Sequence, residues 1–410
     1  MKYGLLGEKL GHSFSAIIHA RLGLYEYELC PVEKEDFPLF MERREFSGIN
    51  VTIPYKKDVI AYCKEISPEA ALCGAVNTIV NRNGELFGFN TDILGLQALM
   101  EKAGVSLSGK NVLILGSGGT SGTALSLCQK MGAGQVQRVS RTGKGESLTY
   151  KEALACRDTQ VIINTTPCGM YPQIDASPID LDAFPRLEAV VDAVYNPLNS
   201  QFVLEGKKRG IPSVGGLFML VAQAVYAAGI FTGTKDLEAR IDSIYEELLK
   251  EKQNVVLIGM PGSGKSTIGR ALAERLGKEF VDSDEQIVKA AGVSIPEIFA
   301  KEGETAFRDR ESRVIGELSI RQGAVIATGG GAVLREKNLN LLRGNGVLVF
   351  LDAPLDSLRA TADRPLSSDF AALKQRYEER YEIYCRAANY RIPVSRNVEE
   401  NVSAMIKELS

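Results

Sequence analysis

A glycine-rich segment in the second half of the chain has the spacing of a phosphate-binding loop. Residues 259–266 read Gly-Met-Pro-Gly-Ser-Gly-Lys-Ser, which matches GxxxxGK[ST] in full, and an apolar run at 254–258 precedes them. The backbone amides of such a loop can cradle phosphates, while Lys265 can reach the β- and γ-phosphates and Ser266 can ligate Mg²⁺. We therefore predict an ATP site with Mg²⁺, formed by Gly262, Ser263, Gly264, Lys265, Ser266 and Thr267.

Charged residues that suit a phosphate acceptor follow this loop. The next apolar run ends in Asp282 and Asp284, and we expect strand alternation to place both carboxylates on one face. A glycine run and three arginines come later, namely 329–331, Arg308, Arg364 and Arg380. Two acids, a glycine platform and three arginines together favour a small, hydroxylated, anionic acceptor.

A second glycine-rich segment lies in the first half of the chain. Residues 116–122 follow the apolar run 111–115 and precede a pattern typical of a helix. The glycines of this segment are Gly116, Gly118, Gly119 and Gly122. This arrangement favours a dinucleotide pyrophosphate at a helix N-terminus, although a tight turn is the simpler alternative. The next strand ends in Ser140-Arg141-Thr142 rather than in an acid. A guanidinium there suits a 2′-phosphate, so we predict NADP rather than NAD, unless Arg141 is only a surface arginine.

Histidine is scarce in this chain. The two histidines are His12 and His19, so metal sites rich in histidine are excluded. Proton transfer elsewhere must use Lys, Asp, Glu, Tyr or Cys.

The apolar patterns predict an α/β protein that positions these residues. We expect strands at 2–6, 26–32 and 49–53, helices after Ser15 and after Tyr55, a hairpin over 76–89 that turns at Asn83-Gly84, and a helix from 91 to 103. Runs at 111–115, 135–140, 160–163 and 187–194 predict a parallel sheet, followed by a buried helix at 216–231 and an amphipathic one at 236–252. A second α/β unit begins at Asn254.

Composition places the chain among ordinary globular proteins. Its 410 residues suggest two or three domains, and its net charge of −3 does not favour nucleic acid or a membrane as a partner. Seven scattered cysteines without a CxxC pair are typical of a reducing compartment. We expect a soluble, cytoplasmic protein whose partners are small molecules, and the sequence leaves the oligomeric state open.

Seven short segments of the first half then indicate a family. They are GHSFS at 11–15, NVTIPYK at 50–56, GAVNT at 74–78, NTD at 90–92, NTTPCGM at 164–170, VYNP at 194–197 and GLFMLVAQ at 216–223. In this order they resemble the shikimate dehydrogenases over residues 1–250. The resemblance implies reversible reduction of 3-dehydroshikimate by NADPH.

The same resemblance implies residue roles. Ser13 and Ser15 would bind the substrate carboxylate. The substrate hydroxyls would lie near Thr52, Asn77, Asp92 and Gln223. Tyr195 and Gly216 would line the cleft, and Gly216 would also belong to the NADP site. Lys56 and Asp92 would form the catalytic pair. A lysine is a reasonable proton donor here, because ketone reduction places negative charge on oxygen and no histidine follows residue 19. Ala16 stands where this family usually has proline.

Residues 253–395 resemble the shikimate kinases. By position, Asp282 would help to hold Mg²⁺ through water, beside Ser266 as a direct ligand. Asp284 would bind the acceptor hydroxyl and could take its proton, and Arg364 would meet the transferred phosphoryl group. The carboxylate clamp would consist of Arg308, Arg380, Gly330 and Gly331, and Arg359 would stack on adenine. The segment 361–364 is short for the family's lid, and Ser367 replaces its leucine.

These predictions combine into a bifunctional enzyme for two consecutive steps toward aromatic amino acids, from 3-dehydroshikimate to shikimate and then to shikimate 3-phosphate. We expect a substrate-binding domain at 1–103, completed by helices at about 217–250, a Rossmann NADP-binding domain at 104–216, and a P-loop kinase domain at 253–410. Two alternatives remain, namely a quinate/shikimate dehydrogenase fused to another kinase, and a sensor without turnover. The full set Lys56, Asp92, Lys265 and Asp284 argues against the sensor.

Overall fold

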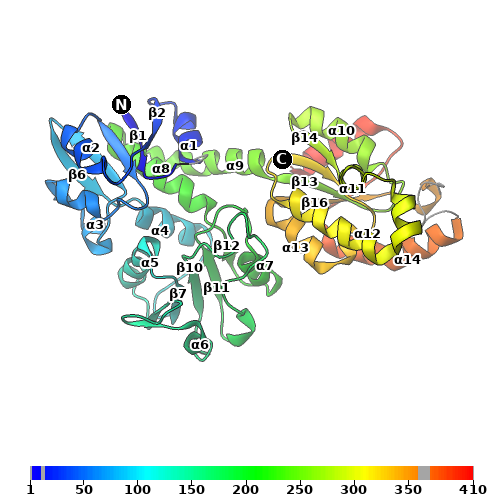
Figure 1. Cartoon of the computed structure of the whole chain (residues 1–410), viewed down its shortest axis with the longest axis horizontal. Coiled ribbons are helices and arrows are strands. Elements are labelled where there is room, and N and C mark those ends of the chain that lie inside the picture. Colours follow the sequence, from blue (N-terminus) through cyan, green and yellow to red (C-terminus); the bar gives the residue numbers. More distant parts are fainter. Residues whose placement is uncertain (1, 11–13, 359–369, 410) are drawn as a thin grey trace. The chain divides into compact units, whose positions relative to one another are not determined.

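The computed structural model describes residues 2–10, 14–358 and 370–409, and the chain divides into two compact units, Met1–Leu248 and Leu249–Ser410. The first unit contains two six-stranded sheets and the second contains one five-stranded sheet (Figure 1). Helices flank all three sheets, which confirms the predicted α/β class.

The first sheet has mixed strand directions and the order β2-β1-β3-β5-β6-β4. Its strands are β1 (Tyr3–Gly7), β2 (Tyr27–Pro31), β3 (Gly48–Val51), β4 (Glu65–Ile66), β5 (Thr78–Arg82) and β6 (Glu85–Phe89). The predicted hairpin is present, since β5 and β6 pair antiparallel around Asn83 and Gly84, whose φ angles are 55° and 87°. Two successive positive φ angles are the signature of a type I′ turn.

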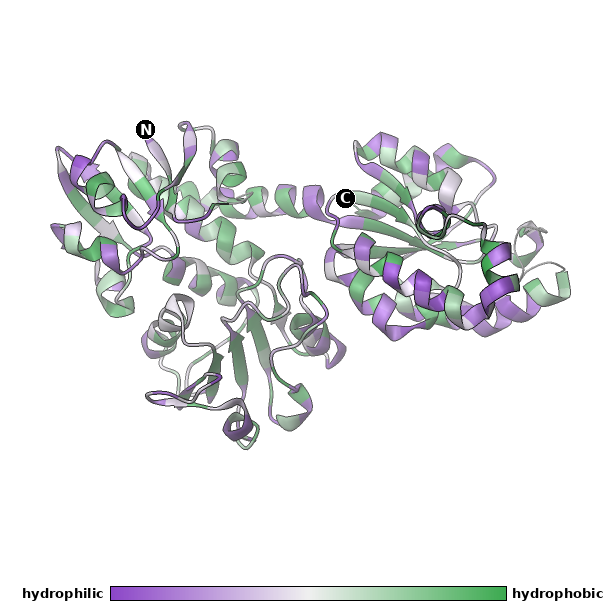
Figure 2. Cartoon of the chain, in the orientation of Figure 1, coloured by the Kyte–Doolittle hydropathy of each residue, from purple (hydrophilic) through white to green (hydrophobic). Residues whose placement is uncertain are grey.

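The second sheet is wholly parallel, with the order β12-β11-β10-β7-β8-β9. Its strands are β7 (Val112–Leu115), β8 (Val136–Val139), β9 (Ser147–Leu148), β10 (Val161–Asn164), β11 (Ala189–Asp192) and β12 (Ser213–Val214). The central strands are buried and rich in valine and isoleucine, as expected where helices cover both faces. They are green in Figure 2, while the helices around them carry purple on their outer sides.

The sheet of the second unit is also parallel, with the order β14-β15-β13-β16-β17. Its strands are β13 (Asn254–Ile258), β14 (Glu279–Asp282), β15 (Ala324–Ala327), β16 (Gly346–Asp352) and β17 (Tyr390–Pro393). The glycine loop follows the central strand β13 and leads into α10 (Lys265–Leu276), as the sequence pattern predicted.

The helices that carry site residues in the first unit are α1 (Phe14–Leu22), α4 (Asp92–Lys102), α5 (Gly119–Lys130) and α8 (Leu217–Thr232). In the second unit they are α10, α11 (Ser283–Ala291), α12 (Ile295–Ser319) and α14 (Phe370–Ala387). The remaining α-helices are α2 (Phe37–Arg43), α3 (Pro68–Cys73), α6 (Tyr150–Ala153), α7 (Gln201–Lys208), α9 (Ile241–Lys252), α13 (Glu336–Asn345) and α15 (Val398–Leu409).

Helix α8 is the predicted buried helix, and it packs against α4 and α1. A Cβ atom on Gly95 of α4 would lie 2.6 Å from the carbonyl oxygen of Met219, so only glycine permits this approach. The close contact brings the N-terminal half of α4 beside the N-terminal half of α8. No helix in the described ranges combines the length and hydropathy needed to cross a bilayer.

Two local predictions were wrong. The segment after Tyr55 forms only a 3₁₀ turn, Asp58–Tyr62, because Val59 is its one buried residue and no apolar stripe holds a longer helix. The segment 236–252 is not one helix either, since a 3₁₀ turn, Leu237–Arg240, precedes α9. Asp236 has a left-handed backbone with φ of 62°, which interrupts the helical path at its start.

Candidate active sites

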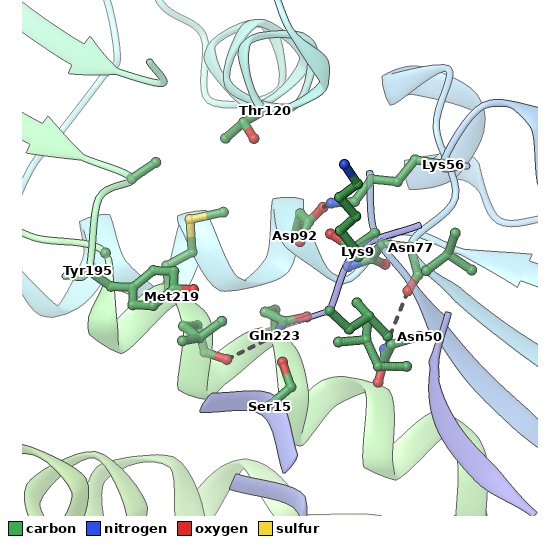
Figure 3. A pocket seen from close by; sticks show the side chains of 17 residues that line it. Lys9, Ser15, Asn50, Lys56, Asn77, Asp92, Thr120, Tyr195, Met219 and Gln223 are labelled. Carbon is green, nitrogen blue, oxygen red and sulfur yellow. Dashed lines mark hydrogen bonds and ion pairs between the residues drawn. The ribbon is translucent and has the colours of Figure 1, made fainter. Parts of the chain in front are cut away.

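A cavity of about 330 Å³ in the first unit gathers the predicted dehydrogenase residues (Figure 3). It is lined by eight of them, namely Ser15, Thr52, Lys56, Asn77, Asp92, Tyr195, Gly216 and Gln223. They come from α1, α4 and α8 and from connections beside strands of both sheets, so segments more than 200 residues apart meet in one place. Ser13 lies outside the described residues.

Lys56 and Asp92 form an ion pair inside this cavity. The distance from Lys56 Nζ to Asp92 Oδ2 is 2.6 Å, and the two side chains are 23% and 15% exposed. Asp92 is the first residue of α4, where the helix dipole favours a carboxylate. The carbonyl of Lys56 accepts a hydrogen bond of 2.8 Å from the amide of Val76, which holds the lysine backbone to the sheet.

Asn77 is almost wholly buried, and its side chain is bound to the start of α4. Its Oδ1 accepts from the amide of Thr91 at 2.7 Å, and its Nδ2 donates to Thr91 Oγ1 at 3.0 Å. The side chain of Gln223 lies nearby and donates to the carbonyl of Leu220 at 3.1 Å. Asn77 therefore orders the helix that carries Asp92, besides facing the cavity.

Tyr195 and Gly216 bound the side of the cavity nearest the second sheet. Tyr195 packs edge-on against Phe14, with ring centroids 5.3 Å apart, and burial raises the pKa of its hydroxyl. A Cβ atom on Gly216 would lie 2.3 Å from the carbonyl oxygen of Ala193, so no larger residue fits this turn. The amide of Gly216 donates to Val194 at 2.8 Å.

The first glycine loop lies between β7 and the N-terminus of α5. Cβ atoms on Gly118 and Gly119 would meet nothing within 4 Å, so this backbone is open to a ligand. Ser140 and the exposed Arg141 follow β8, the strand that pairs with β7, and Thr142 is next. Because parallel strands end at one edge, the glycine loop and Arg141 share an edge of the sheet.

His19 does not belong to this site. It is 1% exposed, its ring stacks on Tyr27 with centroids 3.9 Å apart, and its Nδ1 contacts the hydroxyl of Tyr25 at 2.8 Å. Burial lowers its pKa to about 3, against a weaker opposing contribution from Asn50. The imidazole is therefore neutral and structural.

In the second unit, a cavity of about 550 Å³ joins the glycine loop to the predicted acceptor residues. The predicted residues that line it are Gly262, Gly264, Lys265, Ser266, Thr267, Asp282, Asp284, Arg308, Gly330, Gly331 and Arg380. Ser263 is buried beneath the loop rather than exposed to the cavity. Arg359 and Arg364 lie outside the described residues.

The two acids after β14 lie differently from the expectation. Asp282 ends the strand, but Asp284 stands in the first turn of α11, so strand alternation does not relate them. Instead, Asp282 caps the helix by accepting the amide of Asp284 at 2.9 Å. Its other oxygen accepts from Ser266 Oγ at 2.5 Å. Both acids still face the cavity.

The acceptor side contains a buried carboxylate that the sequence reasoning missed. Glu311 lines the cavity and accepts from Arg308 Nη1 at 2.8 Å, while Glu304 accepts from Arg308 Nη2 at 3.2 Å. Burial opposes the charge on Arg308, but the two glutamates outweigh it and raise the pKa of Arg308. The i, i+3 spacing of Arg308 and Glu311 on one helix could have indicated this pair.

Other lining residues were not predicted as site residues. In the first unit they include Lys9, Asn50, Thr120 and Met219, which Figure 3 labels. In the second unit they include Phe299 and Arg376. Phe299 and Phe307 face each other across a break in α12 at Gly303, whose φ is 79°, with ring centroids 4.7 Å apart.

Comparison with known proteins gives a consistent result for each unit. Residues 5–79 match the family model of the shikimate dehydrogenase substrate binding domain, and residues 261–410 match that of shikimate kinase. The NADP(+) shikimate dehydrogenase of Clostridium perfringens is 37% identical over 266 residues, which cover 60% of this chain and 97% of that protein. The NADP(+) shikimate dehydrogenase of Methanococcus maripaludis is 36% identical over 256 residues, which cover 57% of this chain and 91% of that protein.

Solved structures agree with these relatives. The chorismate mutase/shikimate 5-dehydrogenase fusion protein from Clostridium acetobutylicum has a TM-score of 0.56 and 35% identity, and the match covers 60% of this chain and 96% of that one. Shikimate 5-dehydrogenase from Thermus thermophilus, solved with NADP(H) and shikimate, has a TM-score of 0.54 and 31% identity, covering 60% and 99%.

The fold and the two cavities define an NADP-linked oxidoreductase joined to a P-loop kinase of small molecules. The match to nearly the whole length of several relatives makes the family plain: the chain belongs to the shikimate dehydrogenases over its first unit and carries a shikimate kinase domain after it. It is a bifunctional enzyme of the shikimate pathway.

Proposed function

We propose that Lys56 and Asp92 are the catalytic pair with which the first unit reduces 3-dehydroshikimate to shikimate. NADPH, when bound, supplies the hydride that the ketone carbon accepts. The ammonium group of Lys56 donates a proton to the carbonyl oxygen as negative charge develops there. Asp92 holds that ammonium group in place. The observation that carries this proposal is the 2.6 Å ion pair within a polar cavity.

We propose that the substrate is oriented by the side chains around this pair. Ser15 binds the carboxylate, with Ser13 as its partner by resemblance, and Thr52, Asn77 and Gln223 bind the hydroxyls, while Tyr195 closes the side of the cleft. Each described member lines the cavity. A ring with one carboxylate and several hydroxyls needs such a set, because every buried polar group requires a partner.

For the cofactor, we propose that Gly116, Gly118, Gly119 and Gly122 receive the pyrophosphate at the N-terminus of α5. Ser140, Arg141 and Thr142 receive the 2′-phosphate at the end of β8, and Gly216 borders the nicotinamide. The open space over Gly118 and Gly119 and the exposure of Arg141 support these assignments.

For the second unit, we propose that Asp284 binds the 3-hydroxyl of shikimate and takes its proton. Arg308 and Arg380, with the backbone at Gly330 and Gly331, bind the carboxylate. Gly262 to Thr267 cradle the phosphates of ATP, and the roles of Arg364 on the phosphoryl group and of Arg359 on adenine stay predictions. Positioning and charge neutralisation then account for the transfer.

The residues after the glycine loop also fit Mg²⁺. The hydroxyl of Ser266 and the carboxylate of Asp282 are hard oxygen donors, and they already lie 2.5 Å apart. We propose that these two residues hold the ion, which supplies charge neutralisation for the transferring phosphoryl group when ATP is bound.

We further propose three domains, at 1–103 with about 217–250, at 104–216 and at 253–410. The first two are supported by the two separate sheets of the first unit, and the third by the single sheet of the second. A cytoplasmic location is proposed as well. The seven cysteines are all free thiols, which suits a reducing compartment.

One experiment tests both activities in the intact chain. The wild type is incubated with 3-dehydroshikimate, NADPH and Mg·ATP, and the products are followed by mass spectrometry. Wild type should yield shikimate 3-phosphate. Lys56→Ala should stop at 3-dehydroshikimate but phosphorylate added shikimate, whereas Asp284→Asn should accumulate shikimate. Each variant thus controls for the other, and loss of both activities in either one would contradict the assignment.

A further inference from the structure

A row of polar side chains, all buried except the partly buried Tyr27, runs behind the dehydrogenase cavity. It begins at Tyr27 on β2, continues through Asn50 on β3 and Thr78 and Asn77 at the start of β5, and ends at Thr91 before α4. Strands β2 and β3 flank β1, so the long side chain of Tyr27 is needed to span the middle strand. We call these five residues the polar relay.

Each member of the relay is hydrogen-bonded to the next. Tyr27 donates its hydroxyl proton to Asn50 Oδ1 at 2.8 Å, and Asn50 Nδ2 donates to Thr78 Oγ1 at 3.0 Å and to the carbonyl of Asn77 at 3.3 Å. Thr78 Oγ1 then donates to Asn77 Oδ1 at 3.1 Å. Asn50 and Asn77 stand side by side at the cavity wall in Figure 3.

The far end of the relay, Thr91, directly precedes Asp92 of the proposed catalytic pair. Asn77 Oδ1 accepts a hydrogen bond from the amide of Thr91, and Asn77 Nδ2 donates one to the hydroxyl of Thr91. Thr91 is the residue before α4, and it makes no side-chain cap for its own helix. Asn77 holds the backbone and the hydroxyl of Thr91, and Asn90 Oδ1 accepts from the amide of Ile93 at 3.2 Å. Asn77 therefore helps to set the orientation of Asp92, which lies between Thr91 and Ile93.

Burial makes the relay sensitive to loss of one link. Asn50, Asn77, Thr78 and Thr91 are all less than 9% exposed, so loss of a partner leaves a buried polar group with an unmade hydrogen bond. Without the hydroxyl of Tyr27, Asn50 Oδ1 loses its donor at 2.8 Å and keeps only the weaker interaction with the ring of His19, so the amide gains by turning toward another donor. That turn would also break its bonds to Thr78 and Asn77.

We propose that Tyr27 is a positioning residue of the dehydrogenase, which acts through Asn50, Thr78 and Asn77 to hold Asp92 against Lys56. The inference rests on the proposed roles of Lys56 and Asp92. Tyr27 is not among the residues that line the cavity, so it has no direct contact through which to act.

The test compares Tyr27→Phe with Tyr25→Phe in the full chain. Both changes remove one hydroxyl from the same aromatic cluster, but that of Tyr25 contacts His19 and lies outside the relay. Tyr27→Phe should lower the kcat for shikimate oxidation by about 5- to 30-fold and leave the KM for NADP⁺ unchanged. Tyr25→Phe should keep the wild-type kcat. Equal kcat values for the two variants would overturn the proposal.

A second comparison separates a relay from simple loss of stability. Thr78→Val removes the next link and keeps the side-chain shape, so its effect and that of Tyr27→Phe should not multiply in the double variant. Fully multiplied losses would show independent sites and overturn the relay. The Lys56→Ala variant distinguishes the two proposals. If it retained turnover, the proposed catalytic pair would be wrong. If it were inactive while Tyr27→Phe kept full activity, only the proposed role of Tyr27 would be refuted.

Discussion

Arg308 Nη1 lies 2.8 Å from Oε2 of Glu311, whose side chain is 1% exposed. Both residues line the kinase cavity, and a Cβ atom on Gly331 would overlap the guanidinium group at 2.2 Å. The arginine proposed to bind the acceptor carboxylate is therefore held on one side by a buried glutamate and on the other by a glycine that leaves room for it.

This arrangement predicts a role for Glu311 in acceptor binding. Glu311→Gln keeps the shape but removes the charge that orients Arg308, so the KM for shikimate should rise by about tenfold while the Kd for ATP stays unchanged. The matched control is Glu304→Gln, because Glu304 is 52% exposed and its contact with Arg308 is longer. An exposed pair contributes little, so this variant should change KM less than about threefold. Equal effects would contradict the assignment.

Nucleotide and acceptor binding should be separable in the second unit. Lys265 donates to the carbonyls of Gly259 and Met260, both at 2.9 Å, within the glycine loop. Lys265→Ala should therefore weaken ATP binding by at least tenfold and leave shikimate binding nearly intact, whereas Asp284→Asn should mainly lower kcat. Calorimetric titration of each variant with ATP and with shikimate measures the difference. Wild-type turnover in the Asp284→Asn variant would show that the acceptor site lies elsewhere.

Cofactor choice should depend on Arg141. Its exposed guanidinium at the end of β8 suits a 2′-phosphate, and loss of such a charged contact costs about 1.5–3 kcal/mol, or roughly 10- to 150-fold. The wild type should prefer NADPH, and Arg141→Ala should narrow the ratio of kcat/KM for NADPH over NADH by that factor, without changing kcat/KM for NADH. A wild type with equal kcat/KM for both cofactors would refute this prediction.

A buried carboxylate beside the cofactor edge should make local stability depend on pH. Asp192 is wholly buried, and burial raises its pKa from 3.8 to about 7, against hydrogen bonds from Ser200, Val194 and Asn164. Burial, and after it the charge of Asp192, raises the pKa of the Cys168 thiol. A raised pKa means that the folded state binds the proton more tightly, so this contribution is greatest below pH 4 and is lost as pH rises to about 7.

Amide hydrogen exchange over residues 189–200 measures this effect. After correction for intrinsic exchange, protection in the wild type should fall between pH 5 and pH 7, and Asp192→Asn should remove that fall because it cannot ionise. Asp158→Asn is the control, since Asp158 is 72% exposed and should leave the pH dependence as in the wild type. Persistence of the fall in Asp192→Asn would assign it to another group.

Features that depend on a few adjacent residues could be predicted from the sequence. The glycine loop at 259–266, the type I′ hairpin at Asn83-Gly84 and the apolar strands of the parallel sheets are local patterns, because backbone geometry and periodic burial act over short distances. The two glycine loops and the family segments also indicate both activities from the sequence alone.

The tertiary structure alone decided which distant groups meet. The 2.6 Å distance between Lys56 Nζ and Asp92 Oδ2 joins a loop after β3 to the start of α4, and the hydrogen-bonded path from Tyr27 to Asn77 runs over the four neighbouring strands β2, β1, β3 and β5. Asp284 faces its cavity from a helix turn capped by Asp282, where alternation along a strand had been expected. Such contacts arise when separate segments pack and buried polar groups must find partners, and no local spacing encodes that pairing.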